Sequence, residues 1–497
     1  MYTCVKNFIF PFIINKNCYN NNGDYIMKKT KLICTIGPSS IDDEILIKMI
    51  KEGMDVARVN LSHSNHDFAS LVVEKIRKIN KKLNTNVGIM FDTKGPEIRV
   101  GTFKNGYIEL KEGNIVTLTP KESDGTNGMI NITHKNLSRS LDIESVLILD
   151  EGAIELSVIG IKNTDIMCKV IRGGILKDNK RINVLDTPLD IDFLSIADKD
   201  DILFSSNLDI DFLSLSFVRN ANDVLDVNDI LIGERNEHTQ LISKIENQSA
   251  IDDIENIVKV SDGILVARGD LGVEIELEKL PCAQKMIVRK AQEKNKICIV
   301  ATEMLSSMET KTRPTRAEVS DVANAVIDGV DAVMLSGETA IGNYPKEATA
   351  TITKIIRETE KNLDYKKMLM DKNSDKKEDT TTALAYSTVD IANMINVSAI
   401  VTSTNSGYTA RRVSSYRPNC PIIATTPDKK TATSLSLNWG IIPIVVKKFN
   451  STDEIIENAK EEVKNILDIK EETKIIVTGG FPIKKSRSTN FIKIENI

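Results

Sequence analysis

The stretch LISKIENQSAIDDIENIVKVSDGILVARGDLGV, from Leu241 to Val273, decides the fold. It contains two short apolar runs with helical patterning between them. The first run ends in Glu246 and the second in Asp270, and Lys244 lies two residues before the first carboxylate. If the runs are neighbouring parallel strands, both carboxylates leave the same edge of a sheet beside one cation. That arrangement suits a divalent metal next to a reacting anion.

The same alternation of apolar runs and helical patterns continues on both sides of this stretch. Further runs, most of them followed by a helical pattern, lie at 31–37, 55–61, 87–93, 211–217, 297–302 and 331–336. Capping boxes at Ser40–Asp43 and Thr315–Glu318 predict two of the helix starts. Continuous apolar strands that alternate with helices indicate a parallel sheet covered on both faces. Eight βα units over about 250 residues are typical of an α/β TIM (β/α)8 barrel, whose functional groups lie at the C-terminal ends of the strands.

Two other regions have a different pattern. Short alternating runs with turn residues and no convincing amphipathic helix fill residues 101–185. We therefore predict an inserted all-β domain, a small β-barrel that covers the site, over residues 97–189, with the TIM barrel in residues 27–96 and 190–363. A charged connection at 371–379 precedes a smaller α/β domain, assigned to residues 364–497.

Composition excludes several classes of protein. The net charge is −5 and the basic residues are dispersed, so no nucleic-acid footprint is present. The seven cysteines form no CxxC pair and the four histidines form no HExxH motif, which argues for a reducing, cytoplasmic setting without a zinc site. No apolar run is long enough to span a bilayer. Residues 1–26 lack the features of a signal peptide and are predicted to be a disordered leader or an over-long start.

More polar residues gather at the predicted strand ends. Arg58, Asn60 and Ser62 alternate along one run, so their side chains point to the same side. The segment DTKGPEIR, from Asp92 to Arg99, lies where the β domain is inserted. Carboxylate, amide and hydroxyl oxygens suit magnesium or an alkali cation. Metals, fixed cations and positioning, rather than a covalent nucleophile, are what phosphoryl transfer requires.

Seven motifs carry a family resemblance that extends from about Met27 to the C-terminus. They are CTIGPSS (34–40), ARVNLSHS (57–64), FDTKGPEIR (91–99), SKIEN (243–247), SDGILVARGDLGVEI (261–275), RPTRAEVSDVANAV (313–326) and DAVMLSGETAIGNYP (331–345). With these motifs the chain resembles the pyruvate kinases. The resemblance implies transfer of the phosphoryl group of phosphoenolpyruvate to ADP, giving pyruvate and ATP in the final step of glycolysis. It also implies a homotetramer that is regulated allosterically through the C-terminal domain.

The resemblance further implies roles for individual residues. Glu246 and Asp270 would hold Mg²⁺ (or Mn²⁺), and Lys244 would stabilise charge on the phosphoryl group in transfer, with Arg58 gripping the same phosphate. The backbone amides of Gly269 and Asp270, with the Thr302 hydroxyl, would receive the substrate carboxylate. Thr302 and Ser336 would lie near the path that protonates the enolate. The matching K⁺ ligands are Asn60, Ser62, Asp92 and Thr93. The residues that match ADP contacts are Arg99, Lys180 and Asn183. The loop that resembles a sugar-phosphate or nucleotide effector site contains Thr404, Asn405, Ser406, Gly407 and Thr409; its other reading is a plain β–α turn.

Four positions bear on how closely the family pattern is followed. Glu97 accompanies potassium dependence in the family, so activity is predicted to require K⁺. Glu303 stands where glutamine is usual, and Arg181 stands where glycine is usual, which weakens the nucleotide assignment around it. Residues 486–490 also depart from the usual pattern.

Two rival functions are weighed against this one. A Mg²⁺-dependent barrel lyase or aldolase could use similar carboxylates, but it would not need the inserted domain, the alkali-cation ligands or an ADP-facing arginine. If the chain were a non-catalytic binding protein built on an inactive barrel, residues of the catalytic site would be expected to be missing. Yet Lys244, Glu246, Asp270, Arg58 and Thr302 are all present.

Overall fold

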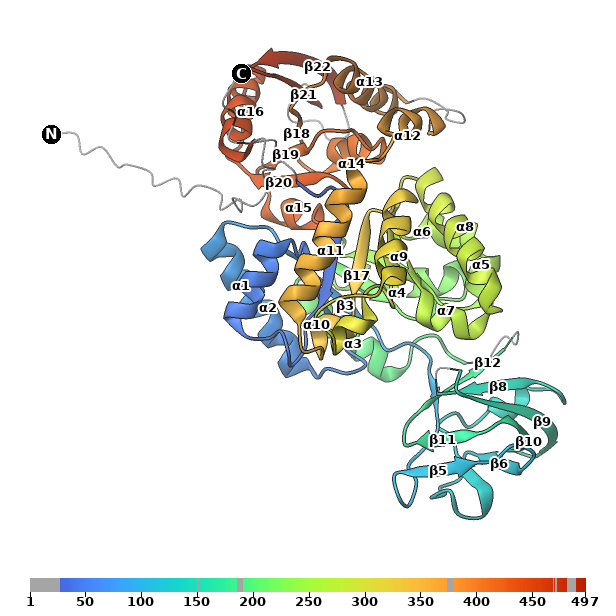
Figure 1. The fold of residues 1–497 in the computed structure, drawn as a ribbon. Helices are drawn as coiled ribbons and strands as arrows, with labels where there is room; N and C mark the ends of the chain where they lie inside the picture. The colour runs from blue at the N-terminus through green and yellow to red at the C-terminus, as the bar shows by residue number, and fades with distance from the viewer. Residues whose placement is uncertain are drawn as a thin grey trace.

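A computed structural model describes residues 27–150, 152–185, 191–372, 379–467, 469, 472–480 and 489–497. The predicted leader at 1–26 and residues 486–488 of the departing C-terminal segment lie outside the described residues. Figure 1 shows a central barrel with the inserted β-rich part on one side and the C-terminal part on the other. Within the described ranges, no helix combines the length and apolarity needed to cross a membrane.

Eight parallel strands close the central barrel in the order β1-β17-β16-β15-β14-β13-β3-β2. The strands are β1 (Lys31–Thr35), β2 (Val56–Asn60), β3 (Gly88–Asp92), β13 (Phe212–Leu215), β14 (Gln240–Ile245), β15 (Gly263–Ala267), β16 (Ile297–Ala301) and β17 (Ala332–Leu335). Their almost wholly buried apolar residues pack inward on one another and outward on the surrounding helices. The opening stretch therefore supplies the fifth and sixth barrel strands, β14 and β15, which pair in parallel as predicted.

Helices cover the outside of the barrel (Figure 1). They are α1 (Asp43–Glu52), α2 (His66–Leu83), α3 (Ile196–Asn207), α4 (Ala221–Gly233), α5 (Gln248–Asp252), α6 (Ile254–Val260), α7 (Arg268–Glu274), α8 (Leu280–Glu293), α9 (Arg316–Ile327), α10 (Gly337–Ala340) and α11 (Pro345–Glu360). The capping box predicted at Thr315 and Glu318 is present at the start of α9. The one predicted at Ser40 is wrong: Asp42 caps α1 through the Glu44 amide, and the Ser40 hydroxyl accepts from Gly37 instead.

The inserted part is all-β, as predicted. A seven-stranded sheet has the order β4-β12-β8-β9-β10-β6-β7, and β11 pairs with β5 in a separate ribbon. The strands are β4 (Ile98–Arg99), β5 (Tyr107–Leu110), β6 (Ile115–Thr119), β7 (Met129–Asn131), β8 (Val146–Leu149), β9 (Ile154–Lys162), β10 (Asp165–Arg172), β11 (Gly174–Lys177) and β12 (Arg181–Val184). A bridge between Val100 and Ile132 joins the two ends of the large sheet, which therefore curls back on itself around its own apolar core.

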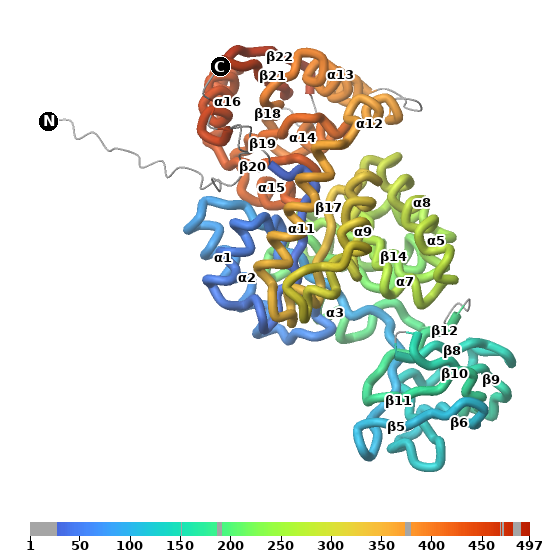
Figure 2. The backbone as a smooth tube through the Cα atoms, viewed as in Figure 1, coloured from blue at the N-terminus to red at the C-terminus, as the bar shows by residue number. Residues whose placement is uncertain are grey.

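The C-terminal part is a five-stranded sheet with helices on both faces. Its strand order is β20-β19-β18-β21-β22, and only β22 is antiparallel to its neighbour. The strands are β18 (Ala399–Ser403), β19 (Ile422–Thr426), β20 (Ile441–Val445), β21 (Lys474–Gly480) and β22 (Thr489–Asn496). The helices are α12 (Tyr365–Asp371), α13 (Thr380–Ile395), α14 (Tyr408–Ser415), α15 (Lys429–Ser434) and α16 (Thr452–Leu467). Sequence reasoning missed β22, which lies beside β21 near the C-terminal end of the chain (Figure 2).

The C-terminal part docks on the N-terminal ends of the barrel strands. Arg417 pairs with Asp331 just before β17. Gln240 is the first residue of β14, and its side-chain amide donates to the Ser434 carbonyl. Leu437 enters the barrel's interior core. The opposite, C-terminal ends of the strands face the inserted part. The predicted site and the predicted effector loop consequently lie on opposite sides of the barrel (Figure 1).

Candidate active site

The C-terminal ends of the barrel strands bring the predicted site residues together. Asn60 and Asp92 are the last residues of β2 and β3 and lie opposite each other in register. Glu246 follows β14 directly and Thr302 follows β16. The position of Asp270 differs from the predicted strand end. The strand β15 ends at Ala267, and Asp270 lies in the first turn of α7. The helix start turns its carboxylate toward Glu246.

Lys244 is the centre of a buried ionic cluster. Its Nζ lies 2.8 Å from Glu246 Oε1 and 3.5 Å from Asp92 Oδ2, and it donates to Ser216 Oγ at 3.0 Å. Arg58 Nη2 donates to the same oxygen, Asp92 Oδ2, at 2.7 Å. Because Lys244, Glu246, Asp92 and Arg58 are all buried, their interactions are screened little by water.

The pKa directions follow from this packing. Burial would lower the pKa of Lys244, but Glu246 and Asp92 outweigh it and raise that pKa above its usual value. Burial would raise the pKa of Asp92, but Arg58 and Lys244 hold it below its usual value. Burial raises the pKa of Glu246 to about 7; Lys244 opposes the shift and the like charge of Asp270 adds to it. The cluster therefore holds two fixed cations, and the charge of Lys244 does not fully offset the effect of burial on the pKa of Glu246.

The donor set fits cations. Asp92 Oδ1 is buried without a hydrogen-bond partner, and Glu246 Oε1 has only the ion-pair distance to Lys244, without hydrogen-bond orientation. Buried oxygens of this kind are costly unless a bound ion or water satisfies them. In the described part of the chain, no group of three or more His, Cys, Asp or Glu side chains could hold a metal. Two carboxylates still suit Mg²⁺, which usually keeps several water ligands and takes others from a substrate.

Ser216 joins this cluster to the proposed alkali-cation ligands. Its hydroxyl donates to the Thr93 carbonyl at 2.7 Å, and its amide donates to Thr93 Oγ1 at 3.1 Å. Asn60 Oδ1 accepts from the amide of Ser62 at 3.1 Å. Sequence reasoning missed Ser216, although a polar residue directly after β13 was a signal for the same barrel mouth.

Thr302 has an unusual backbone. Its φ of 65° is rare for a β-branched residue, and φ is also positive at Glu303. Thr302 Oγ1 accepts from the Gly269 amide at 2.7 Å, while buried Arg268 donates to the Thr302 carbonyl at 2.5 Å. Arg268, which sequence reasoning also missed, thus supports a conformation that places Thr302 against α7. Ser336 is half-buried after β17, and its amide donates to Glu338.

The three residues assigned to ADP have protein partners. Arg99 donates to Glu97 Oε2 at 2.9 Å and 2.6 Å through Nε and Nη2, and Lys180 pairs with Asp150 at 2.6 Å. Asn183 donates to Glu274 on α7. Arg99 lies on β4 and Lys180 directly precedes β12, both in the inserted part, whereas its contact with Glu274 brings Asn183 to the barrel.

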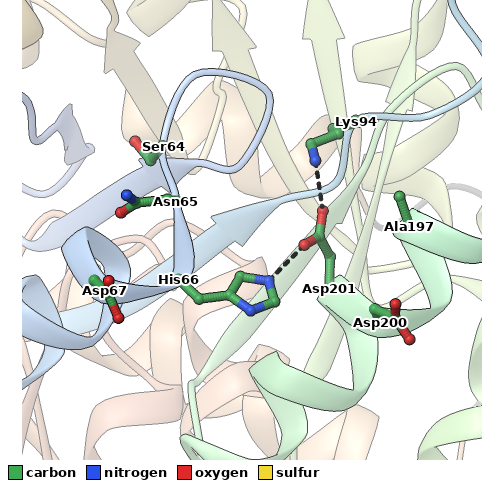
Figure 3. A pocket seen from close by; sticks show the side chains of 8 residues that line it. All are labelled: Ser64, Asn65, His66, Asp67, Lys94, Ala197, Asp200 and Asp201. Carbon is green, nitrogen blue, oxygen red and sulfur yellow. Dashed lines mark hydrogen bonds and ion pairs between the residues drawn. The ribbon is translucent and has the colours of Figure 1, made fainter.

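A polar pocket lies beside the mouth, between the starts of α2 and α3 (Figure 3). Lys94 and His66 both point to Asp201, at 3.6 Å and 2.7 Å. The pocket has a volume of about 440 Å³, and its other lining residues are Ser64, Asn65, Asp67, Ala197 and Asp200. Lys94 therefore turns away from the Lys244 cluster, although it follows Thr93 in sequence.

The candidate effector loop lies between β18 and α14. Gly407, with φ 78°, caps α14, and Arg411 donates back to the Ser406 carbonyl at 2.9 Å. Thr409 Oγ1 lies 2.7 Å from Thr489 Oγ1 on β22. The loop also touches α15, because Thr431 Oγ1 donates to the Asn405 carbonyl at 3.1 Å.

Comparison with known proteins agrees with this geometry. Residues 27–349 match the family described as "Pyruvate kinase, barrel domain", and residues 382–495 match "Pyruvate kinase, alpha/beta domain". A Clostridium perfringens protein named "Pyruvate kinase" is 43% identical over 477 residues, covering 95% of this chain and 100% of the relative. A Staphylococcus saprophyticus relative of the same name is 43% identical, covering 94% of this chain and 80% of its own. One from Clostridium acetobutylicum is 40% identical, covering 94% and 99%. The chain therefore belongs to the pyruvate kinase family and is a phosphotransferase.

Proposed function

We propose that this enzyme transfers the phosphoryl group of phosphoenolpyruvate to ADP in the cytoplasm, giving pyruvate and ATP as the last step of glycolysis. The observation that carries the proposal is the buried cluster in which Lys244 lies between Glu246 and Asp92, with Arg58 behind them. Two fixed cations at one barrel mouth can stabilise the negative charge of a phosphoryl group during transfer, and no proton has to move.

Glu246 and Asp270 would hold Mg²⁺ or Mn²⁺. Such an ion polarises substrate oxygens and stabilises the negative charge that develops on them. The raised pKa of Glu246 supports this assignment, because a bound cation would stabilise the charged carboxylate that burial disfavours. Asn60, Ser62, Asp92 and Thr93 would hold K⁺, for which the unpartnered Asp92 Oδ1 is the main support.

The protein groups have separate tasks toward the substrate. The amides of Gly269 and Asp270, at the start of α7, would receive the carboxylate, and the Thr302 hydroxyl would help. Lys244 and Arg58 would contact the phosphoryl group as its bond to the enol oxygen breaks and a bond to ADP forms. Arg99, Lys180 and Asn183 would contact ADP.

The enolate left after transfer must gain a proton. Thr302 and Ser336 lie at the ends of β16 and β17, neighbouring strands of the barrel. A hydroxyl is too weak an acid to act alone, so these residues would guide a water to the carbon.

The three parts of the chain would have separate roles. The TIM barrel of residues 27–96 and 190–363 would carry the chemistry, and residues 97–189 would cover it. Residues 364–497 would carry regulation through Thr404, Asn405, Ser406, Gly407 and Thr409, which would bind a sugar phosphate or a nucleotide. The assembly is proposed to be a homotetramer.

A coupled assay of pyruvate release tests the reaction. The assay is run with and without ADP, with and without K⁺, and with a panel of sugar phosphates and nucleotides. Release that depends on ADP supports the kinase. ADP-independent consumption of an enolate substrate would favour the lyase or aldolase, and no turnover under any condition would favour a non-catalytic protein.

A further inference from the structure

Ser216 lies between the proposed catalytic lysine and one of the proposed alkali-cation ligands. Its hydroxyl accepts from Lys244 Nζ at 3.0 Å and donates to the Thr93 carbonyl at 2.7 Å. A hydroxyl has a single proton to donate, so the bond to Thr93 turns a lone pair of Ser216 toward Lys244. The Ser216 amide adds a second bond, to Thr93 Oγ1 at 3.1 Å. Ser216 is 3% exposed, so these contacts are shielded from competing water.

The backbone next to this hydroxyl is strained. Ser216 directly follows β13, and the next residue, Phe217, has a φ of 58°, which is rare for a bulky side chain. Strain of this kind persists only where the surrounding structure imposes it, and it is concentrated at functional sites. Here the strained backbone directs the Phe217 amide to Glu246 Oε2, 2.6 Å away. Two successive residues after β13 thus hold two charged groups near the end of the neighbouring strand, Lys244 and Glu246.

The linker that leaves β3 packs against the same two residues. Gly95 has a φ of 71°, and a Cβ atom there would lie 2.7 Å from the Ser216 carbonyl oxygen and 3.0 Å from the Phe217 ring. Glycine is the residue that lets the linker approach this closely. Ser216 and Phe217 are therefore enclosed, with Thr93 and Gly95 on one side and the end of β14 on the other. A shift of either residue would disturb both sides.

Lys244 needs a directional contact of this kind. Its ammonium group ends a flexible four-carbon stem and can rotate among acceptors. Glu246 and Asp92 attract it by charge, at 2.8 Å and 3.5 Å, and attraction between charges has little directional preference. The contact with the Ser216 hydroxyl has hydrogen-bond geometry, and the strength of a hydrogen bond depends steeply on its angle. The carboxylates therefore supply the attraction, and Ser216 supplies the direction.

We propose that Ser216 is a positioning residue that fixes the Lys244 ammonium group relative to Thr93, so that the catalytic lysine and an alkali-cation ligand form one unit. The proposal rests on the proposed roles of Lys244 and Thr93. Loss of the Ser216 hydroxyl would release both groups at once. Loss of another buried hydroxyl on the same strand would release neither.

The first test measures binding of Tl⁺, an ion close in size to K⁺ that nuclear magnetic resonance can observe, without phosphoenolpyruvate or ADP. Ser216→Ala is compared with wild type and with Ser214→Ala. Ser214 is a matched control because it lies two residues earlier, in β13, and its buried hydroxyl has no hydrogen-bond partner in the described part of the chain. We expect Ser216→Ala to bind Tl⁺ about tenfold more weakly than wild type, the factor expected for one lost hydrogen bond. Ser214→Ala should match wild type.

The second test is kinetic. In the coupled assay, Ser216→Ala should lower kcat by about tenfold, because Lys244 loses its directional contact, and should leave KM for ADP unchanged. Ser216→Thr keeps the hydroxyl and should restore both kcat and Tl⁺ affinity. If thermal unfolding shows that the added methyl group destabilises Ser216→Thr, the comparison of Ser216→Ala with Ser214→Ala decides alone.

Three results would overturn the proposal. One is unchanged Tl⁺ affinity in Ser216→Ala, whether or not kcat falls, because the two groups would then not form a unit. Another is equal loss in Ser216→Ala and Ser214→Ala, which is the general effect of removing a buried hydroxyl. The third is wild type that binds no Tl⁺, because the ion site at Thr93 would then be absent.

These outcomes are separable from failure of the proposed function. If wild type binds Tl⁺ but shows no ADP-dependent turnover, the reaction assignment fails, and the Tl⁺ measurement still decides whether Ser216 supports the ion site. If wild type turns over and Ser216→Ala matches it in kcat and Tl⁺ affinity, only the role of Ser216 fails.

Discussion

Lys244 Nζ lies 2.8 Å from Glu246 Oε1, and both groups are buried at the C-terminal end of β14. Lys244 keeps its charge because Glu246 and Asp92 raise its pKa despite burial. Its ammonium group is thus fixed where a phosphoryl group would pass. The relationship between these two residues leads to the first prediction.

Replacing Lys244 with Met should reduce kcat by about 10³-fold, the cost typical of losing one preorganised charge at a transition state. Coupled assays at saturating substrates measure the loss. Lys285→Met is the control, because the exposed Lys285 on α8 pairs with Asp328 at the end of α9, so its loss should leave kcat unchanged. Full turnover by Lys244→Met would show that the reacting group lies elsewhere.

Potassium should be required for activity. The buried Asp92 Oδ1 has no hydrogen-bond partner, and position 97 is a glutamate, paired with Arg99, rather than a lysine whose ammonium group could replace the ion's charge. Assays with only Tris or tetramethylammonium as counter-ions should lose activity by about 10²-fold relative to K⁺. Added KCl should restore it, whereas tetramethylammonium chloride at equal ionic strength should not. Full activity without K⁺ would contradict the ligand assignment.

Thr302 should act through its hydroxyl rather than its methyl group. Thr302→Ala removes the hydroxyl that would donate to the substrate carboxylate and should raise KM for phosphoenolpyruvate about tenfold, as expected for one lost hydrogen bond to a charged group. Thr302→Ser keeps the oxygen and relieves a β-branched residue from positive φ, so its KM should stay near wild type. Equal KM values for the Ala and Ser variants would rule out this role.

Asp55 should make stability depend on pH. It pairs with Lys28 and Lys31 and accepts from the Leu32 amide. Burial would raise its pKa, but Lys28 and Lys31 hold it below the ordinary 3.8. A depressed carboxyl pKa stabilises the fold above the unfolded-state value, and that stabilisation is lost as the pH falls through the folded-state value.

Thermal unfolding checks this prediction. Asp55→Asn should be less stable than wild type by about 2 kcal/mol at pH 7. The difference in Tm should persist down to about pH 5 and shrink below pH 4. Asp43→Asn, which affects a solvated pair with Lys75, should change Tm little at any pH. A Tm difference for Asp55→Asn that does not change with pH would show that the ionised carboxylate is not what stabilises the barrel.

Local pattern was sufficient for much of the fold and part of the site. The eight barrel strands were predictable because each is a short, mainly apolar run, and the start of α9 because Thr315 and Glu318 satisfy each other's backbone amides. Lys244 and Glu246 were predictable as neighbours because residues two apart in a strand share a side. The second strand was predicted to continue to Asp270 but ends at Ala267, where Arg268 and Gly269 interrupt the apolar run and α7 begins.

The order of the elements and the identity of the groups at each strand end could therefore be predicted, because both depend on contacts between near neighbours. Which distant groups meet depended on the packing of the folded chain. Ser216 reaches Lys244 from an adjacent strand, Arg268 supports Thr302, and Arg181 crosses from the inserted sheet to Asp270, 89 residues away. The physical reason is that these contacts depend on how separate layers pack. The same arginine in a β strand could equally face solvent, and no local rule assigns it a carboxylate on another part of the fold.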